Sequence, residues 1–143
     1  MREVIQCIGK LPDDLSEMLC LEGGCMEIFI DERAIRHIKK RHPYTYKTYF
    51  DKLSEILSAP DYIGIQGLVA NRFELVKQYK DTLLVALKID EMFRIFVSSM
   101  YIIESHRIEK RIAYGKLKVV DRSKTEYKRK KEKKKGKSGN IIR

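Results

Sequence analysis

The sequence predicts an α+β fold in which N-terminal helices pack on a four-stranded antiparallel sheet. Two observations predict this class. Apolar residues recur with helical spacing in two segments between residues 31 and 58, and a proline follows each segment. Four strand-like segments come next, between residues 61 and 103, and short polar connections join the last three. Connections this short join antiparallel neighbours.

The first 30 residues predict shorter elements. Residues 4–8 fit either a strand or a turn of helix. Residues 11–19 resemble a short helix, because a proline and two aspartates stand at its start. After a Gly-Gly break, residues 25–30 (CMEIFI) predict a short strand that leads into the first of the two main helices.

That helix is short and basic, and it ends at a histidine. Asp31 is a good N-cap, and Ile35 and Ile38 fall on one face. The proline after His42 disfavours helical geometry at the residue before it, so the helix should end there. At about 100° per residue, His42 returns to the apolar face, whereas His37 points away from it. A core or capping role is the simplest interpretation of a single histidine of this kind.

The remaining elements follow from periodicity and from Pro and Gly signals. Residues 46–58 carry a broad apolar stripe and predict a second helix that ends before a proline. The four strands are expected at residues 61–66, 72–79, 82–89 and 93–103. Residues 106–114 predict a closing helix with Gly115 as its C-terminal cap.

Charge divides the 143-residue chain into a body and a tail. Residues 121–143 hold 11 Lys/Arg against 3 Asp/Glu, a net of +8, whereas residues 1–120 have a net of only +2. We therefore expect one domain over 1–120, followed by a basic, disordered tail that has almost nothing to bury. The tail could bind the phosphates of a nucleic acid without preference for its nucleotide sequence, or it could serve only to keep the protein soluble.

The cysteines and the apolar content predict a soluble, cytoplasmic protein without cofactors. Cys7, Cys20 and Cys25 form an odd set with no disulfide framework, which is typical of a reducing compartment. No apolar run approaches the roughly 20 residues of a membrane span, and the start lacks a signal-peptide pattern. No set of residues has metal-ligand spacing, so we expect no metal.

Polar residues interrupt two apolar strand faces. By the period of two along a strand, Lys77 is the one charge on a face shared with Phe73, and Ser99 and Tyr101 share a face with Val97. We expect Lys77 and Ser99 to line one surface across the intervening strand. Taken singly, Lys77 fits a strand end and Ser99 a hydrogen-bonded core position.

Together with His42, these residues suit RNA cleavage without a metal ion. A base removes the proton of a ribose 2′-OH, and the 2′-oxygen attacks the adjacent phosphate. Cations and hydroxyls stabilise the charge that develops on the phosphate. His42 would act as base or acid, Lys77 and Arg107 as phosphate stabilisers, and Ser99 and Tyr101 as positioning groups or donors.

The motif order resembles that of a known group. HIKKRHP, PDYIG, ELVK and SSMY, followed by a basic helix, resemble the phage-associated branch of the Barnase–EndoU–Colicin–RelE (BECR) nuclease superfamily over about residues 26–115. The resemblance implies the four-stranded fold and metal-independent RNA cleavage by toxins or mobile-element effectors. It places the family's helix-end histidine on His42, its strand lysine on Lys77, its hydroxyl on Ser99, and its last basic residue on Arg107 or Lys110.

These inferences predict an endoribonuclease that leaves a 2′,3′-cyclic phosphate, with an RNA such as a tRNA as substrate and an antitoxin or immunity protein as a partner. His37 and His106 remain alternative histidines, and Ser98 an alternative hydroxyl. A non-catalytic nucleic-acid-binding accessory protein and a phage structural or assembly protein are the alternative functions. The residues expected to bind nucleic acid are Lys39, Lys40, Arg41, Arg72, Lys110, Lys130 and Lys131.

Overall fold

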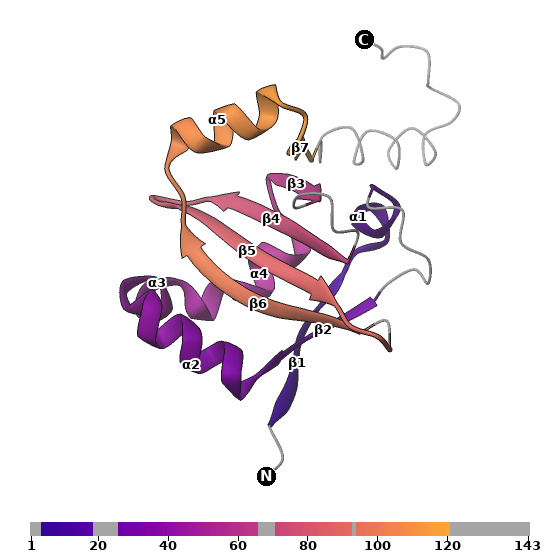
Figure 1. Ribbon diagram of the computed structural model, residues 1–143, viewed down its shortest axis with the longest axis vertical. Helices are drawn as coiled ribbons and strands as arrows, with labels where there is room; N and C mark the ends of the chain where they lie inside the picture. The colour runs from indigo at the N-terminus through magenta and orange to yellow at the C-terminus, as the bar shows by residue number, and fades with distance from the viewer. Residues whose placement is uncertain (1–3, 19–25, 66–70, 93, 121–143) are drawn as a thin grey trace, which may run out of the picture.

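A single mixed sheet of seven strands organises the chain (Figure 1). The computed structural model describes residues 4–18, 26–65, 71–92 and 94–120. The strand order across the sheet is β1-β2-β6-β5-β4-β3-β7. The strands are β1 (Ile5–Leu11), β2 (Met26–Asp31), β3 (Tyr62–Ile65), β4 (Arg72–Gln78), β5 (Thr82–Ile89), β6 (Ile95–Ile102) and β7 (Lys118–Val119).

The predicted four-stranded antiparallel sheet is therefore wrong as a description of the fold. The strands β3 to β6 do pair antiparallel in the expected order. However, β2 adds to the β6 edge in a parallel register through Ile28–Ile95 and Phe29–Phe96, and β1 pairs antiparallel with β2. At the other edge β7 pairs with β3. Pairing covers the otherwise open edges of β6 and β3, and it buries Ile28 completely.

The helices differ from prediction in the second of the two main segments. The predicted helix over 46–58 is divided into α3 (Pro43–Tyr49), a 3-10 turn η1 (Phe50–Lys52) and α4 (Leu53–Ser58). Helix α3 begins earlier than expected because Pro43 occupies its first turn, where a missing N–H costs nothing. The other helices are α1 (Asp13–Met18), α2 (Glu32–Arg41) and α5 (Ser105–Ala113).

Helices cover the two faces of the sheet unequally. One face packs against α1 to α4 in the larger core, which includes Ile38, Leu57, Leu75 and Val85. Among the described residues, the opposite face packs against α5 and the segment after it, around Val76, Leu84, Ile108 and Leu117. In Figure 1, α5 is separated by the sheet from α2 and α3. A large part of the α5 face is therefore left to polar side chains.

A β-bulge in β6 decides which residues reach the α5 face. Ala86 pairs with Ser99 but Leu87 pairs with Val97, so Ser98 is the extra residue, and its hydroxyl donates a 3.1 Å hydrogen bond to the Ala86 carbonyl. The bulge reverses the alternation, which turns Val97 toward the α1–α4 core and Ser99 toward α5. The prediction that these two residues share a face is therefore wrong.

Several predictions fall outside the described residues. These are the tail at 121–143 with Lys130 and Lys131, and the cysteines Cys20 and Cys25. Cys7 is described and is an exposed free thiol. Within the described part of the chain, none of the helices has the length and apolar character needed to cross a membrane.

Candidate active site

His42 occupies the junction between two helices. As predicted, α2 begins at an Asp31 cap, whose carboxylate accepts a 2.9 Å hydrogen bond from the Ala34 N–H, and it ends at His42. The His42 N–H donates to the Ile38 carbonyl at 2.8 Å, and the His42 carbonyl accepts from the Tyr46 N–H at 2.9 Å. One residue thus closes α2 and starts α3, which fixes its backbone from both sides.

The His42 ring stacks on Tyr101 of β6. The ring centroids are 5.5 Å apart and the planes are inclined by 29°. This contact is possible because β2 pairs with β6 only at Ile95 and Phe96, so α2 and α3 contact the second half of β6. Tyr101 also packs on the α5 side of the sheet, so the stack connects the helix junction to that face.

His37 lies close to His42, contrary to the separation expected on a continuous helix. Their ring centroids are 6.0 Å apart in an edge-on arrangement. The backbone of His42 has left helical geometry (φ −135°, ψ 62°), which allows its ring to approach the preceding turn. His37 is exposed, whereas His42 is half-buried.

This environment favours a neutral imidazole. Burial is the main cause that lowers the pKa of His42 from its ordinary 6.5, and the positive charges of His37 and Arg41 lower it further. A lowered pKa leaves His42 unprotonated near pH 7, which is the state that a general base needs.

Asp81 fastens α3 to the sheet. Its carboxylate oxygen Oδ2 accepts hydrogen bonds from the hydroxyls of Tyr44, at 3.0 Å, and Tyr49, at 2.9 Å. The Asp81 N–H in turn donates to the Tyr49 hydroxyl at 3.2 Å. Because α3 starts at His42, this clamp between the β4–β5 turn and α3 also restrains the position of the imidazole.

Lys77 lies apart from this cluster. Its ammonium donates a 2.8 Å hydrogen bond to the Ala59 carbonyl, just past the end of α4, and lies 6.0 Å from the centre of the Tyr79 ring. Lys77 shares the helix-covered face with Phe73, whereas Ser99 lies on the opposite face. The expectation that Lys77 and Ser99 line one surface is wrong, and the bulge at Ser98 is the reason.

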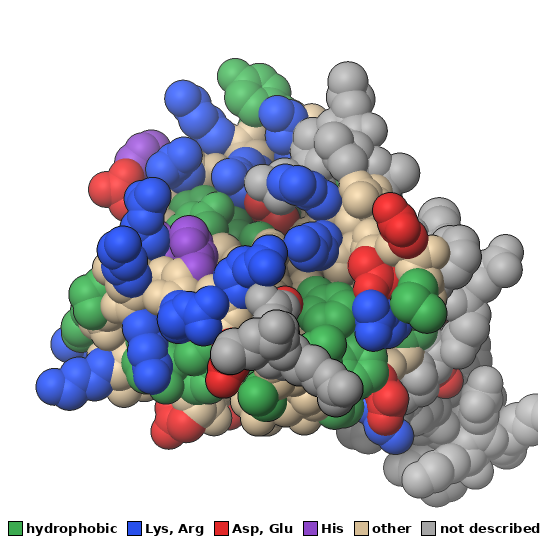
Figure 2. Space-filling view, turned by 60° about the horizontal axis from the view of Figure 1, so that its bottom comes forward, with side chains coloured by type: hydrophobic (Ala, Val, Ile, Leu, Met, Phe, Trp, Pro, Cys, Tyr) green, Lys and Arg blue, Asp and Glu red, His purple; other side chains and the backbone are tan. Residues whose placement is uncertain are grey.

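The α5 face of the sheet carries three of the predicted cations. Figure 2 shows Lys and Arg side chains gathered around a histidine on one side of the molecule. Arg107, Lys110 and Arg111 of α5 line a pocket of about 410 Å³ above the sheet. On the sheet, Arg72 of β4 pairs with Lys88 of β5, on the same face as this pocket. The predicted residues Arg72, Arg107 and Lys110 thus lie on one face.

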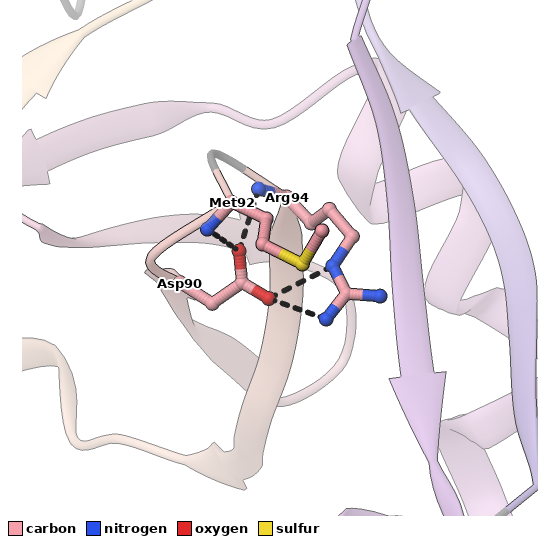
Figure 3. Close-up of polar contacts among 3 residues, drawn as sticks. All are labelled: Asp90, Met92 and Arg94. Atoms are coloured by element: carbon pink, nitrogen blue, oxygen red, sulfur yellow. Dashed lines mark hydrogen bonds and ion pairs between the residues drawn. The ribbon is translucent and has the colours of Figure 1, made fainter.

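A structured turn holds another arginine at the far end of this face (Figure 3). Asp90 accepts hydrogen bonds from the backbone N–H groups of Met92 and Arg94, and its other oxygen binds the Arg94 guanidinium at 2.8 Å. These bonds, led by the Arg94 N–H, lower the pKa of Asp90. The Arg94 guanidinium lies 5.2 Å from the centre of the Phe96 ring, and it lines a second pocket with Arg72 and Lys88.

The other predicted residues lie around the helix junction or on α5. Lys39, Lys40 and Arg41 form the exposed last turn of α2, with the Lys39 ammonium 5.1 Å from the centre of the Tyr46 ring. His106 is exposed at the start of α5 and lies 3.7 Å from Glu104. Groups of three or more metal-ligating side chains do not occur among the described residues.

Sequence reasoning missed the acidic residue on this face. Glu74 is 3% exposed and pairs with Arg111 of α5 through a 2.6 Å contact. In the sequence, Glu74 shares a strand face with Arg72 and Gln78 and so resembles a solvent-facing position. Arg111 was the one available signal for a buried acid. It is a basic residue near the end of a predicted helix, and a helix that packs on a sheet can bring such a residue against an acidic partner.

Comparison with protein families decides the class. A family model for phage-Barnase-EndoU-ColicinE5/D-RelE-like nuclease 3 matches residues 6–110, which is most of the chain. The chain belongs to this nuclease family. The match begins in β1 and ends within α5, so it extends the resemblance drawn from the motifs toward the N-terminus. No curated protein and no solved structure matches the chain.

Proposed function

We propose that this phage-type BECR nuclease is an endoribonuclease that needs no metal ion and acts as a toxin or mobile-element effector. The observation that carries the proposal is His42, a half-buried imidazole with a lowered pKa, stacked on Tyr101 beside a basic sheet face. A neutral base next to cations meets the needs of 2′-OH attack on a phosphate.

In the proposed reaction, His42 takes the proton of the 2′-OH. The bond between the 2′-oxygen and phosphorus forms, and the bond to the 5′-oxygen breaks. The Tyr101 hydroxyl supplies the proton to the departing 5′-oxygen and recovers one from the His42 imidazolium. The products are a 2′,3′-cyclic phosphate and a 5′-hydroxyl, so atoms and charges balance.

Arg107 is the proposed stabiliser of the phosphate charge, and Ser99 the proposed hydroxyl donor. The Ser98 hydroxyl is used in the bulge, so Ser99 presents its hydroxyl on the α5 face. Arg107 and Arg111 are one helical turn apart on α5, and Arg111 is fixed on Glu74 of β4. Because α5 follows β6 in the chain, Arg107 lies nearer than Arg111 to the β6 end of the helix.

Lys39, Lys40, Arg41, Arg72 and Lys110 are proposed to bind the flanking phosphates of a single-stranded RNA such as a tRNA loop. Lys130 and Lys131 of the tail are proposed to add contacts that carry no sequence preference. Lys77 is left out of the proposed site, because its ammonium holds the end of α4. An antitoxin or immunity protein that covers the basic face remains the proposed partner.

The test is RNA cleavage by the full chain in excess EDTA, with total RNA and tRNA as substrates. Wild type should cleave, and His42→Ala should lose about 10²–10⁴-fold in rate, as expected for a lost general base. Lys77→Met serves as the control variant and should cleave like wild type. Equal cleavage by wild type and His42→Ala, or loss of wild-type cleavage in EDTA, would contradict the proposal.

A further inference from the structure

A hollow beside the β5–β6 turn lies on the same side of the sheet as α5 but is separate from the pocket that α5 lines. Its volume is about 440 Å³, and its basic residues are Arg72 of β4, Lys88 of β5 and Arg94. Its two acidic residues, Asp90 and Glu91, belong to the turn. Three basic side chains against two acidic ones give the hollow a net charge of +1, and α5 supplies none of them.

A row of paired residues crosses the sheet at this hollow. Arg72 pairs with Lys88, and Lys88 pairs with Phe96 of β6. Phe96 in turn pairs with Phe29 of β2, and their ring centroids lie 5.8 Å apart. Phe96 points away from the larger core, because Ile95 before it packs into that core. The row therefore places two cations beside two aromatic rings on the α5 side of the sheet.

The Arg94 guanidinium is held in a fixed plane. Its Nε and Nη2 atoms both donate to the Asp90 Oδ2 at 2.8 Å, and its central carbon lies 5.2 Å from the centre of the Phe96 ring. The side chain of Arg94 nevertheless stays 44% exposed, and Figure 3 shows its remaining terminal nitrogen directed away from Asp90. An arginine fixed in this way loses little conformational entropy when a ligand stacks on it.

Arg72 and Lys88 are cations without acidic partners. Both are exposed, and among the described residues neither forms an ion pair. They lie directly opposite each other on neighbouring strands, where like charges are destabilising unless an anion lies between them. A phosphate group, which accepts hydrogen bonds from both side chains, suits this pair.

The turn itself suits a nucleobase rather than a second phosphate. Asp90 already matches the charge of Arg94, so the guanidinium offers a ligand chiefly its flat surface. Met92, which is 70% exposed, brings a flexible apolar side chain to the same hollow. Unstacked bases of single-stranded RNA stack on guanidinium planes and aromatic rings. A ligand that presents a base and a phosphate close together is a nucleotide within a single strand.

We propose that the β5–β6 turn is a base-stacking subsite for single-stranded RNA, in which a base stacks on the Arg94 guanidinium and the neighbouring phosphate binds Arg72 and Lys88. The inference rests on the proposed RNA-cleaving function, because it assigns this turn to a nucleotide outside the cleaved bond.

The subsite lies well away from the proposed catalytic group. Lys88 is four positions along β5 from Leu84, which pairs with Tyr101, so the subsite lies about 14 Å along the strands from the His42–Tyr101 stack. About four stacked nucleotides, or fewer extended ones, cover that distance. The subsite thus contacts the RNA several nucleotides from the bond that is cleaved.

The test is NMR titration of the full chain, in EDTA, with a 2′-O-methyl oligoadenylate and with a 2′-O-methyl oligomer of the same length that lacks bases. Both ligands carry the same phosphates, and neither has the free 2′-OH that the proposed reaction needs. Stacking places the Arg94 Nε–H over a base, so the oligoadenylate should shift its proton signal upfield and the abasic oligomer should not. An unmoved signal at saturating oligoadenylate, or equal shifts with both ligands, would overturn the proposal.

Arg94→Lys separates stacking from charge, because lysine keeps the cation but lacks the guanidinium plane. Its affinity for the oligoadenylate should fall about tenfold, as expected for the loss of one stacked base, while its affinity for the abasic oligomer should not change. The matched control is Arg36→Lys, because Arg36 also pairs with an acid four positions away, Glu32, and it should keep both affinities. Unchanged oligoadenylate affinity in Arg94→Lys, or an equal loss for both ligands, would contradict the stacking role.

The two proposals can fail separately, because binding of these oligomers requires no cleavage. RNA cleavage by a protein whose Arg94 signal does not respond to bases removes the subsite alone. A base-dependent Arg94 signal in a protein that does not cleave RNA removes the nuclease mechanism alone. Base-independent binding at Arg72 and Lys88 would mark an anion site, open also to an acidic protein, and would overturn the assignment to a base.

Discussion

At the scale of single residues, His42 combines structural and chemical roles. It closes α2, starts α3 and stacks on Tyr101. The capping role, which is the simpler interpretation of the sequence, is therefore present alongside an environment suited to catalysis. Burial and the nearby charges of His37 and Arg41 both act against its protonation.

The pH dependence of cleavage follows from this environment. A general base works only when unprotonated, so kcat/KM should fall as pH drops through the His42 pKa, at a midpoint below 6.5. His37→Gln removes a nearby positive charge and should move this midpoint to higher pH. His106→Gln, which changes a histidine at the start of α5, should leave it in place. A midpoint above 6.5 in wild type would contradict the assignment of His42 as base.

At the scale of elements, the position of α3 is set by a side-chain clamp. The α2–α3 junction carries His42, and α3 is joined to the β4–β5 turn by the two tyrosine hydroxyls on Asp81. Tyr49 is 5% exposed, so its O–H depends on that carboxylate for an acceptor. The clamp therefore couples the stability of α3 to the geometry of the site.

Asp81→Ala tests this coupling. The variant leaves the buried Tyr49 O–H without an acceptor, although the backbone N–H of residue 81 can still donate to it, and this should lower the free energy of unfolding by about 1–3 kcal/mol. It should also reduce cleavage while the protein remains folded, because α3 loses its attachment. Urea unfolding and kcat measured on the same sample check both effects. Glu91→Ala, an exposed acid in the next turn, is the control. Unchanged stability in Asp81→Ala would contradict the clamp.

At the scale of the whole molecule, the sheet separates two functions. The face under α1 to α4 holds the larger core, and the face under α5 presents Arg72, Arg107 and Lys110. Residues 1–120 have a net charge of only +2, so the proposed RNA binding would have to come from this uneven placement rather than from overall charge.

The salt dependence of RNA affinity tests whether the cations on the α5 face contact phosphates. The variant Arg72→Gln/Lys88→Gln should reduce the slope of log affinity for single-stranded RNA against log salt by about 1.4, or 0.7 per lost phosphate contact. Lys10→Gln, on the β1 edge of the sheet, should leave the slope unchanged. Equal slopes for the double variant and for wild type would place RNA binding elsewhere on the chain.

Capping residues, prolines and hydrophobic periodicity predicted both ends of α2 and most strands correctly. The Asp31 cap, the end of α2 at His42 and the strands β3 to β6 follow from residues within a few positions of one another. The parallel pairing of β2 with β6 joins residues more than 60 positions apart, and no local pattern indicates it. The bulge at Ser98 reversed the face of Ser99, and so it separated the predicted Lys77–Ser99 pair.

The central claim is that cleavage proceeds through the ribose 2′-oxygen with His42 as base. The most direct measurement is mass spectrometry of the product ends from an oligoribonucleotide that wild type cleaves, alongside the same oligonucleotide with a 2′-O-methyl group at the cleaved position. The account predicts 2′,3′-cyclic phosphate and 5′-hydroxyl ends from the first and no cleavage at the methylated position. Ends with 5′-phosphate and 3′-hydroxyl, or cleavage at the methylated position, would contradict it.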